Sequence, residues 1–168
     1  MNKTISIIAA ALLLVSAPAF AADKNPLLDH LTGRWVLTGT IEGKPTTHDV
    51  AAEWILQNTY VRLTEVSRET DKAGKPQYEA EVLVAYDAAK KHYVCFWYDI
   101  TGVAAPDTGG GVAERQGDTL PFLFKIGATP FHTTFIYQAA ADSWVWTMDG
   151  EDKGKLVPFA RLTLKRAP

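Results

Sequence analysis

Residues 77–101 read QYEAEVLVAYDAAKKHYVCFWYDIT, and this stretch decides the fold class. Successive side chains of a strand point to opposite faces, so a period of two predicts a strand with one polar and one apolar face. Glu79 and Glu81 fall on one face of the first ten residues. The other face carries Tyr78, Val82, Val84 and Tyr86. Residues 87–91 are typical of a turn, and residues 92–101 form a second strand-like run. The stretch therefore predicts an antiparallel hairpin.

The same alternation recurs along most of the chain, with short connections rich in Gly, Pro and Asp. Short connections favour antiparallel strands in up-and-down order. A sheet of this length must close on itself to bury its apolar face and remove its edges. We therefore expect an all-β fold, an antiparallel up-and-down β-barrel of eight to ten strands, as a single domain over residues 22–168. The expected strands are 34–42, 50–58, 60–70, 77–86, 92–101, 112–115, 119–126, 131–138, 143–148 and 156–165.

The first 21 residues, MNKTISIIAAALLLVSAPAFA, have the three parts of a secretory signal peptide. A positive start precedes an apolar run, and Ala19 and Ala21 form an A-x-A cleavage site. The apolar run is shorter than the roughly 20 residues that a membrane span needs. We expect cleavage after Ala21, a periplasmic or secreted protein, and no membrane span.

Residues 23–32, DKNPLLDHLT, predict a short N-terminal helix ahead of the first strand. Pro26 suits the first turn of a helix, because it has no backbone N–H to satisfy there. Gly33 ends the helical pattern. One face of the helix would carry Leu27, Leu28 and Leu31.

Composition narrows the classes of partner. The chain has 17 Lys and Arg against 19 Asp and Glu, a formal net charge of −2, so no basic excess favours nucleic acid. The single cysteine, Cys95, leaves no intramolecular disulfide, and its strand-like surroundings predict a buried, inert thiol. Histidine and cysteine never occur with metal-ligand spacing, so we expect neither a metal nor another cofactor.

Aromatic residues are abundant on the expected strands, and they pose the central question about the barrel. Large rings fill cores, but they also line apolar ligand sites. A filled interior and a liganded cavity therefore both remain open. The expected aromatic wall consists of Trp35, Trp54, Tyr86, Phe96, Tyr98, Trp144 and Trp146.

Arg62 is a candidate for holding a polar head group. It shares its strand phase with Tyr60, and if that face points inward, its guanidinium would bind a carboxylate or phosphate. In the other phase Val61 and Leu63 point inward, and Arg62 is an ordinary surface charge. A similar choice applies to Glu53, opposite in phase to its neighbour Trp54.

The opening of the first strand resembles lipocalins. Leu31-Thr-Gly33-Arg34-Trp35 is similar to their G-x-W motif, and Trp54-Ile-Leu56 and Ala85-Tyr86-Asp87 extend the likeness. Together these motifs resemble a family of secreted bacterial lipocalin-like, calycin-type β-barrels classed as a domain of unknown function. The resemblance implies that Trp35 plugs the barrel floor and that an arginine near the end of the barrel packs on it. Arg161 and Arg166 are both available for that role. The family implies a fold and supplies no activity.

We expect non-covalent binding of a small apolar or amphipathic molecule in the barrel, with Tyr98 and His132 helping Arg62 to fix its polar head. The alternatives are a solid-core envelope or partner-interaction module, a haem-binding barrel that would use a lone histidine, and an enzyme. No nucleophile motif supports catalysis, since Ser67 and Ser143 both lie outside a G-x-S-x-G pattern. The glycine-rich residues 102–111 are a candidate lid. The candidate ligand-binding residues are Trp35, Tyr60, Arg62, Tyr86, Phe96, Tyr98, His132, Trp144 and Trp146.

Overall fold

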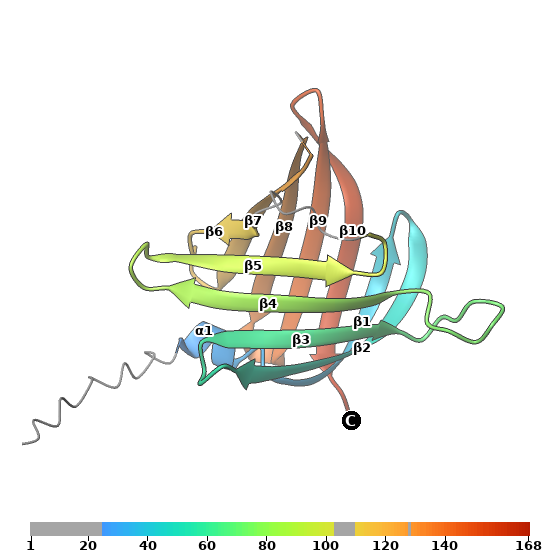
Figure 1. Ribbon diagram of the computed structural model, residues 1–168, viewed down its shortest axis with the longest axis horizontal. Coiled ribbons are helices and arrows are strands. Elements are labelled where there is room, and N and C mark those ends of the chain that lie inside the picture. The colour runs from blue at the N-terminus through green and yellow to red at the C-terminus, as the bar shows by residue number, and fades with distance from the viewer. Residues whose placement is uncertain (1–24, 103–109, 128) are drawn as a thin grey trace, which may run out of the picture.

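The computed structural model describes residues 25–102, 110–127 and 129–168, which form a closed antiparallel β-barrel (Figure 1). Each strand pairs with its neighbours in the chain, and the last strand closes on the first. This confirms the expected all-β barrel and its up-and-down order. The expected signal peptide and most of the expected lid lie outside the described residues. The strands are β1 (Gly33–Ile41), β2 (Lys44–Ile55), β3 (Tyr60–Ser67), β4 (Glu79–Asp87), β5 (His92–Asp99), β6 (Gly111–Ala113), β7 (Thr119–Ile126), β8 (Thr129–Gln138), β9 (Ser143–Asp152) and β10 (Lys155–Arg166).

A short helix closes one end of the barrel. Helix α1 (Pro26–Asp29) begins after Asn25, whose side chain accepts a hydrogen bond from the backbone N–H of Leu27. The leucines expected on one face, Leu27, Leu28 and Leu31, are all buried. The indoles of three strands donate to the helix and the turn after it: Trp35 to the Leu31 carbonyl, Trp54 to Asp29, and Trp144 to the His30 carbonyl. Among the described residues no helix is both long and apolar enough to cross a membrane.

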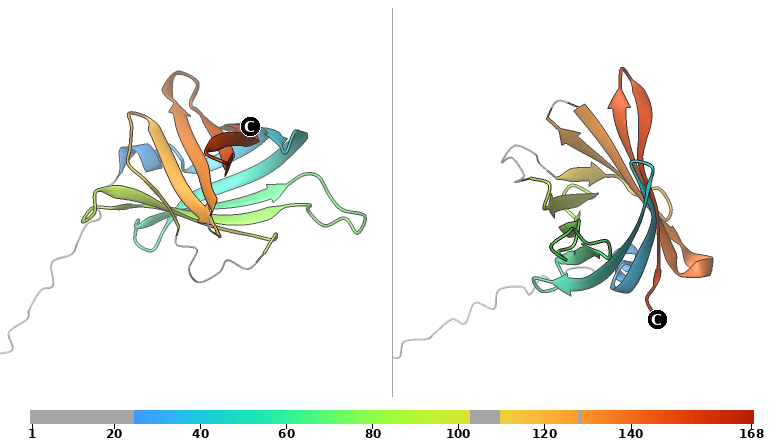
Figure 2. Two further views of the ribbon diagram at one scale, coloured as in Figure 1. Left: turned by 90° about the horizontal axis from the view of Figure 1, so that it is seen from above. Right: turned by 90° about the vertical axis from the view of Figure 1, so that its right-hand side faces the viewer.

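The interior next to the helix is packed with aromatic rings. Trp146 stacks on Phe135 with ring centroids 4.3 Å apart, and Phe122 meets Phe135 edge-on at 5.4 Å. Trp35 and Trp144 are also fully buried. This half of the barrel is therefore a solid core. The strands curve around the interior from this end to the other (Figure 2).

Strand β2 corrects the sequence prediction, which placed its start at residue 50 and His48 in a loop. Glu42 and Gly43 have φ angles of 49° and 73°, and Ile41 pairs directly with Lys44. The chain thus reverses in a two-residue hairpin with both central residues at positive φ, and β2 begins at once. Pro45 is tolerated near the start of the strand. His48 consequently lies inside the barrel, where it is 1% exposed.

Strand β3 points Val61 and Leu63 into the barrel and Arg62 outward. Val61 and Leu63 are fully buried, so Arg62 lies on the outer surface, where it is paired with Glu53 and is near Glu81. The surface alternative for Arg62 and Glu53 is the correct one.

Strand β5 corrects the expected aromatic wall. Tyr93 and Cys95 are buried and share a phase with Trp97, so Phe96 and Tyr98 belong to the outward phase. Burial raises the pKa of the Cys95 thiol well above its ordinary value, which keeps this sulfur protonated.

Candidate functional site

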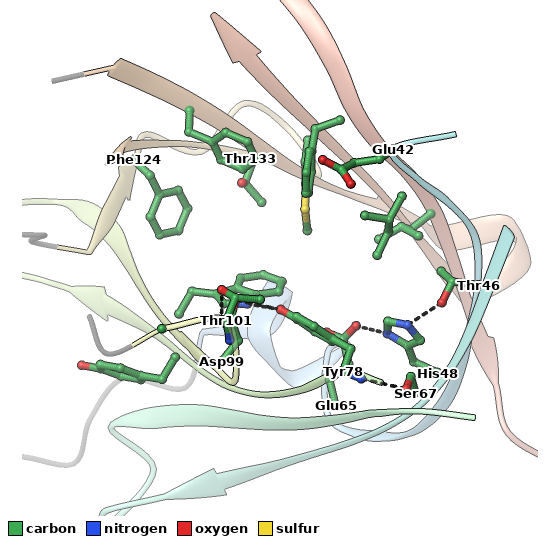
Figure 3. Close-up of a pocket in the computed structure, with 18 of the residues that line it drawn as sticks. Glu42, Thr46, His48, Glu65, Ser67, Tyr78, Asp99, Thr101, Phe124 and Thr133 are labelled. Carbon is green, nitrogen blue, oxygen red and sulfur yellow. Dashed lines mark hydrogen bonds and ion pairs between the residues drawn. The ribbon is translucent and has the colours of Figure 1, made fainter. Parts of the chain in front are cut away.

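The end of the barrel remote from α1 holds a cavity of about 840 Å³. It is reached past the hairpin between β1 and β2 and past the ends of β5 and β7. One side of it is mainly polar and the opposite side is mainly apolar, with Glu42 also on the latter side, as the close-up in Figure 3 shows. In the described ranges, no group of three or more His, Cys, Asp or Glu side chains is placed to hold a metal ion.

The polar side is built around a buried histidine–glutamate pair. His48 on β2 and Glu65 on β3 are 1% and 2% exposed, and the imidazole Nδ1–H donates to Glu65 Oε1. Both face inward because they share a phase with apolar neighbours, Val50 in β2 and Leu63 in β3. Burying charged groups is unfavourable unless they are paired, which explains why each stands against the other.

One oxygen of this pair is left over. Glu65 Oε2 is buried, lies among the cavity-lining residues, and has no hydrogen-bond partner. A buried carboxylate oxygen without a donor loses its hydration with no compensation. Trp146 Nε1 is also buried without a partner, but Trp146 belongs to the solid core and not to the cavity lining.

Thr46 links the pair to a second carboxylate. Its Oγ1 lies 2.6 Å from His48 Nε2 and 3.2 Å from Glu69 Oε2. The single hydroxyl proton goes either to the neutral imidazole or to Glu69, and in the second case the imidazole must carry both protons. Burial raises the pKa of Glu69, but hydrogen bonds from its own backbone N–H and that of Thr47 outweigh this, so its pKa lies below the ordinary value and it is ionised.

A tyrosine packs against the histidine at the edge of the cavity. The Tyr78 ring stacks on the His48 ring with centroids 5.5 Å apart. Its hydroxyl accepts from Trp97 Nε1 at 2.9 Å and donates to Asp99 Oδ2 at 3.1 Å. Burial, helped by the nearby charge of Glu65, raises the pKa of Tyr78 well above its ordinary value, so the hydroxyl keeps its proton.

The apolar side is formed by β7 to β10 and the end of β1. Phe131 and Phe159 meet edge-on with centroids 5.5 Å apart, and Phe159 sits at a register shift in β10 that adds its ring to the core surface. In Figure 3, Phe124 and Thr133 lie across the cavity from His48 and Tyr78. The other apolar residues on this side are Ile41, Met148 and Leu162.

The predicted site residues are scattered by the fold. Trp35 and Trp144 are buried in the core at the helix end, and Trp146 is buried farther along, edge-on against the cavity-lining Trp97. Tyr60 and Arg62 are on the outward phase of β3. Tyr86 is 39% exposed near Tyr93, at the helix end of the barrel. His132 is on the outer surface beside Glu151. Phe96 and Tyr98 alone border the cavity, from the outward phase of β5 at its edge.

Sequence reasoning missed the inward polar residues. Every second residue of a strand faces the same way, so Glu65 shares the inward face of Val61 and Leu63. His48 likewise shares the inward face of Val50, and the alternation could therefore have identified both residues. An inward glutamate was not expected because strand interiors rarely hold one.

No known protein-family model matches this chain, and a search of curated proteins finds no relative.

Proposed function

We propose that this protein binds a small amphipathic molecule in the cavity. The observation that carries the proposal is the division of the lining, with the His48–Glu65 pair and Tyr78 on one side and phenylalanine rings on the other. An apolar body would bury its surface against Phe124 and Phe131, and a polar end would reach the carboxylates.

The volume fits such a ligand. Pockets for small molecules run from roughly 300 to 1,000 Å³, and this one is about 840 Å³. Filled cores lack voids of this size, so the unfilled half of the barrel favours binding over a solid-core module. The A-x-A motif at Ala19 and Ala21 supports the further proposal that binding takes place in the periplasm or outside the cell.

A pair of tryptophan variants tests the proposal. Thr133 faces the cavity, whereas its neighbour Thr134 is on the outward phase of β8. Nile red is a neutral probe whose fluorescence rises in apolar surroundings. Its fluorescence should increase with the wild type and with Thr134→Trp. Thr133→Trp should weaken the signal, because its indole occupies part of the space. A wild type that leaves the probe dark, or equal signals from both variants, would refute binding in the cavity.

A second candidate function is supported by one observation. A chain of hydrogen bonds runs from the Thr46 hydroxyl to the His48 imidazole and on to the Glu65 carboxylate. In hydrolases, this order of groups activates the hydroxyl as a nucleophile. In such a reaction Thr46 Oγ1 attacks an ester carbonyl, and His48 Nε2 takes the hydroxyl proton and passes it to the leaving alcohol. Water then releases the acid and restores Thr46.

This candidate is tested with p-nitrophenyl butyrate. Thr46→Val should abolish any hydrolysis, while Thr47→Val, one residue along β2, should retain it. Equal rates for the two variants would reject Thr46 as a nucleophile.

A further inference from the structure

The hydrogen-bond donors on the polar side of the cavity are already used within the protein. Trp97 Nε1 donates to the Tyr78 hydroxyl, and that hydroxyl donates to Asp99. The Ser67 hydroxyl donates to the Glu69 carbonyl at 2.9 Å, and both nitrogens of His48 have partners. A ligand that needs donors finds these inner ones committed, and the lysines Lys44 and Lys125 are exposed at the rim. The Thr133 hydroxyl across the cavity serves as donor or acceptor and favours neither kind of ligand.

What the polar side still offers is an acceptor. Glu65 Oε2 has no partner, and both the oxygen and its side chain are buried, so a donor from outside the chain would complete it once the side chains over it move aside. An ionised carboxylate accepts most strongly from a charged N–H group.

The charges around the cavity also favour a cationic ligand over an anionic one. Its described lining contains four carboxylates and two lysines, of which both lysines and one carboxylate, Glu42, are exposed at the rim. Phenylalanine and tryptophan rings on the remaining sides attract cations through their negative faces. A carboxylate or phosphate head would lie against like charges. The carboxylates are Glu42, Glu65, Glu69 and Asp99, and the lysines are Lys44 and Lys125.

We propose that the ligand carries a protonated amine, which donates to Glu65 Oε2 while its apolar part lies against Phe124 and Phe131. This inference rests on the proposed binding function and specifies its ligand class as an amphipathic amine. His48 then acts as a positioning residue, because its Nδ1–H holds Glu65 Oε1 and leaves Oε2 for the ligand.

Three probes with the same chain test the proposal: n-octylamine, n-octanol and n-octanoate, each titrated calorimetrically into the wild-type protein at pH 7. We expect octylamine to bind about tenfold or more tightly than octanol, and octanoate to bind most weakly. Octanol or octanoate binding as tightly as octylamine would overturn the amine proposal and leave the binding function standing. Binding of none of the three would overturn both.

Glu65→Gln tests the acceptor itself. The amide keeps the shape and an oxygen for His48 but removes the charge, so the preference for octylamine over octanol should fall to about twofold or less. The matched control is Glu81→Gln, which removes a carboxylate from the outer face of β4 and should leave the preference unchanged. An undiminished preference in a folded Glu65→Gln would exclude Glu65 as the amine partner. The wild-type comparison decides the ligand class even where this variant does not fold.

Discussion

The guanidinium of Arg166 lies over the indole of Trp35, with its central carbon 3.7 Å from the ring centroid. Of the two arginines that the sequence offered for this position, the structure selects Arg166. Its other contacts join distant parts of the chain, because it donates to the carbonyls of His30 and Thr32 and to the carboxylate of Asp142. The start and the end of the barrel are thereby tied together at the helix end.

Arg166→Ala should destabilise the fold by about 2 kcal/mol, since it removes a cation–π contact and several hydrogen bonds to backbone carbonyls. Arg161→Ala is the matched control. Arg161 pairs with Asp149 and donates to the carbonyls of Met148 and Ala160, so it matches Arg166 except for the contact with an indole, and its loss should cost about 1 kcal/mol. Urea unfolding of both variants measures the difference. Equal losses would show that the contact with Trp35 contributes nothing beyond an ordinary surface pair.

The same arginine predicts a pH dependence. The hydrogen bond from Arg166 holds the pKa of Asp142 below its ordinary value of 3.8. The carboxylate thus stabilises the fold fully above the unfolded pKa, and this contribution is lost as the pH falls through the lowered folded pKa. Asp142→Asn, which tolerates the left-handed φ of 42°, should lower the urea midpoint at pH 7 and leave it unchanged near pH 2. In an Arg166→Ala background the effect at pH 7 should shrink to the share that the Tyr137 hydroxyl provides by donating to Asp142 Oδ1 at 3.0 Å, and an undiminished effect there would exclude Arg166 as the source of the stabilisation.

The sequence predicted the barrel well because alternation and short turns are local signals. The expected range 119–126 matches β7, and the start of β3 at Tyr60 is also correct. The predicted ends of strands were less accurate where a hairpin lacks the usual turn residues. Glu42-Gly43 adopts positive φ at both positions, although asparagine or aspartate is the common partner of glycine in such turns. That turn concealed the first part of β2, and with it His48.

The site was less predictable because it depends on the inward phase of each strand. Aromatic character alone does not fix the phase, since Phe96, Trp97 and Tyr98 are consecutive and only Trp97 points inward. The pairing of His48 with Glu65 arises from the register of β2 against β3, which aligns Val50 with Glu65. No single-strand pattern contains that register, so the pair could not be read from either strand separately.

The His48–Glu65 pair predicts a strong coupling in a double-mutant cycle. His48→Leu leaves a buried carboxylate without its donor, and Glu65→Leu leaves a buried imidazole without its acceptor, so each should cost about 3–5 kcal/mol. The double variant replaces both groups by apolar side chains and should be more stable than either single variant. Urea unfolding at pH 7 checks this order. A double variant whose loss equals the sum of the two singles would mean that the side chains do not interact.

Gly39 in β1 pairs with Leu162 in β10, and the close approach of β10 there predicts a sharp difference between two glycine substitutions. A Cβ at Gly39 would lie 2.0 Å from the backbone oxygen of Arg161, and the residue has a φ of +152°. Because a strand and not a flexible side chain is in the way, Gly39→Ala must push β10 aside where the barrel closes, at a cost of at least about 3 kcal/mol. Gly150→Ala in β9 meets nothing within 4 Å and should change the unfolding free energy by less than about 0.5 kcal/mol. Thermal and urea unfolding of the two variants measure the contrast, and a Gly39→Ala protein as stable as Gly150→Ala would contradict the close pairing of the first and last strands.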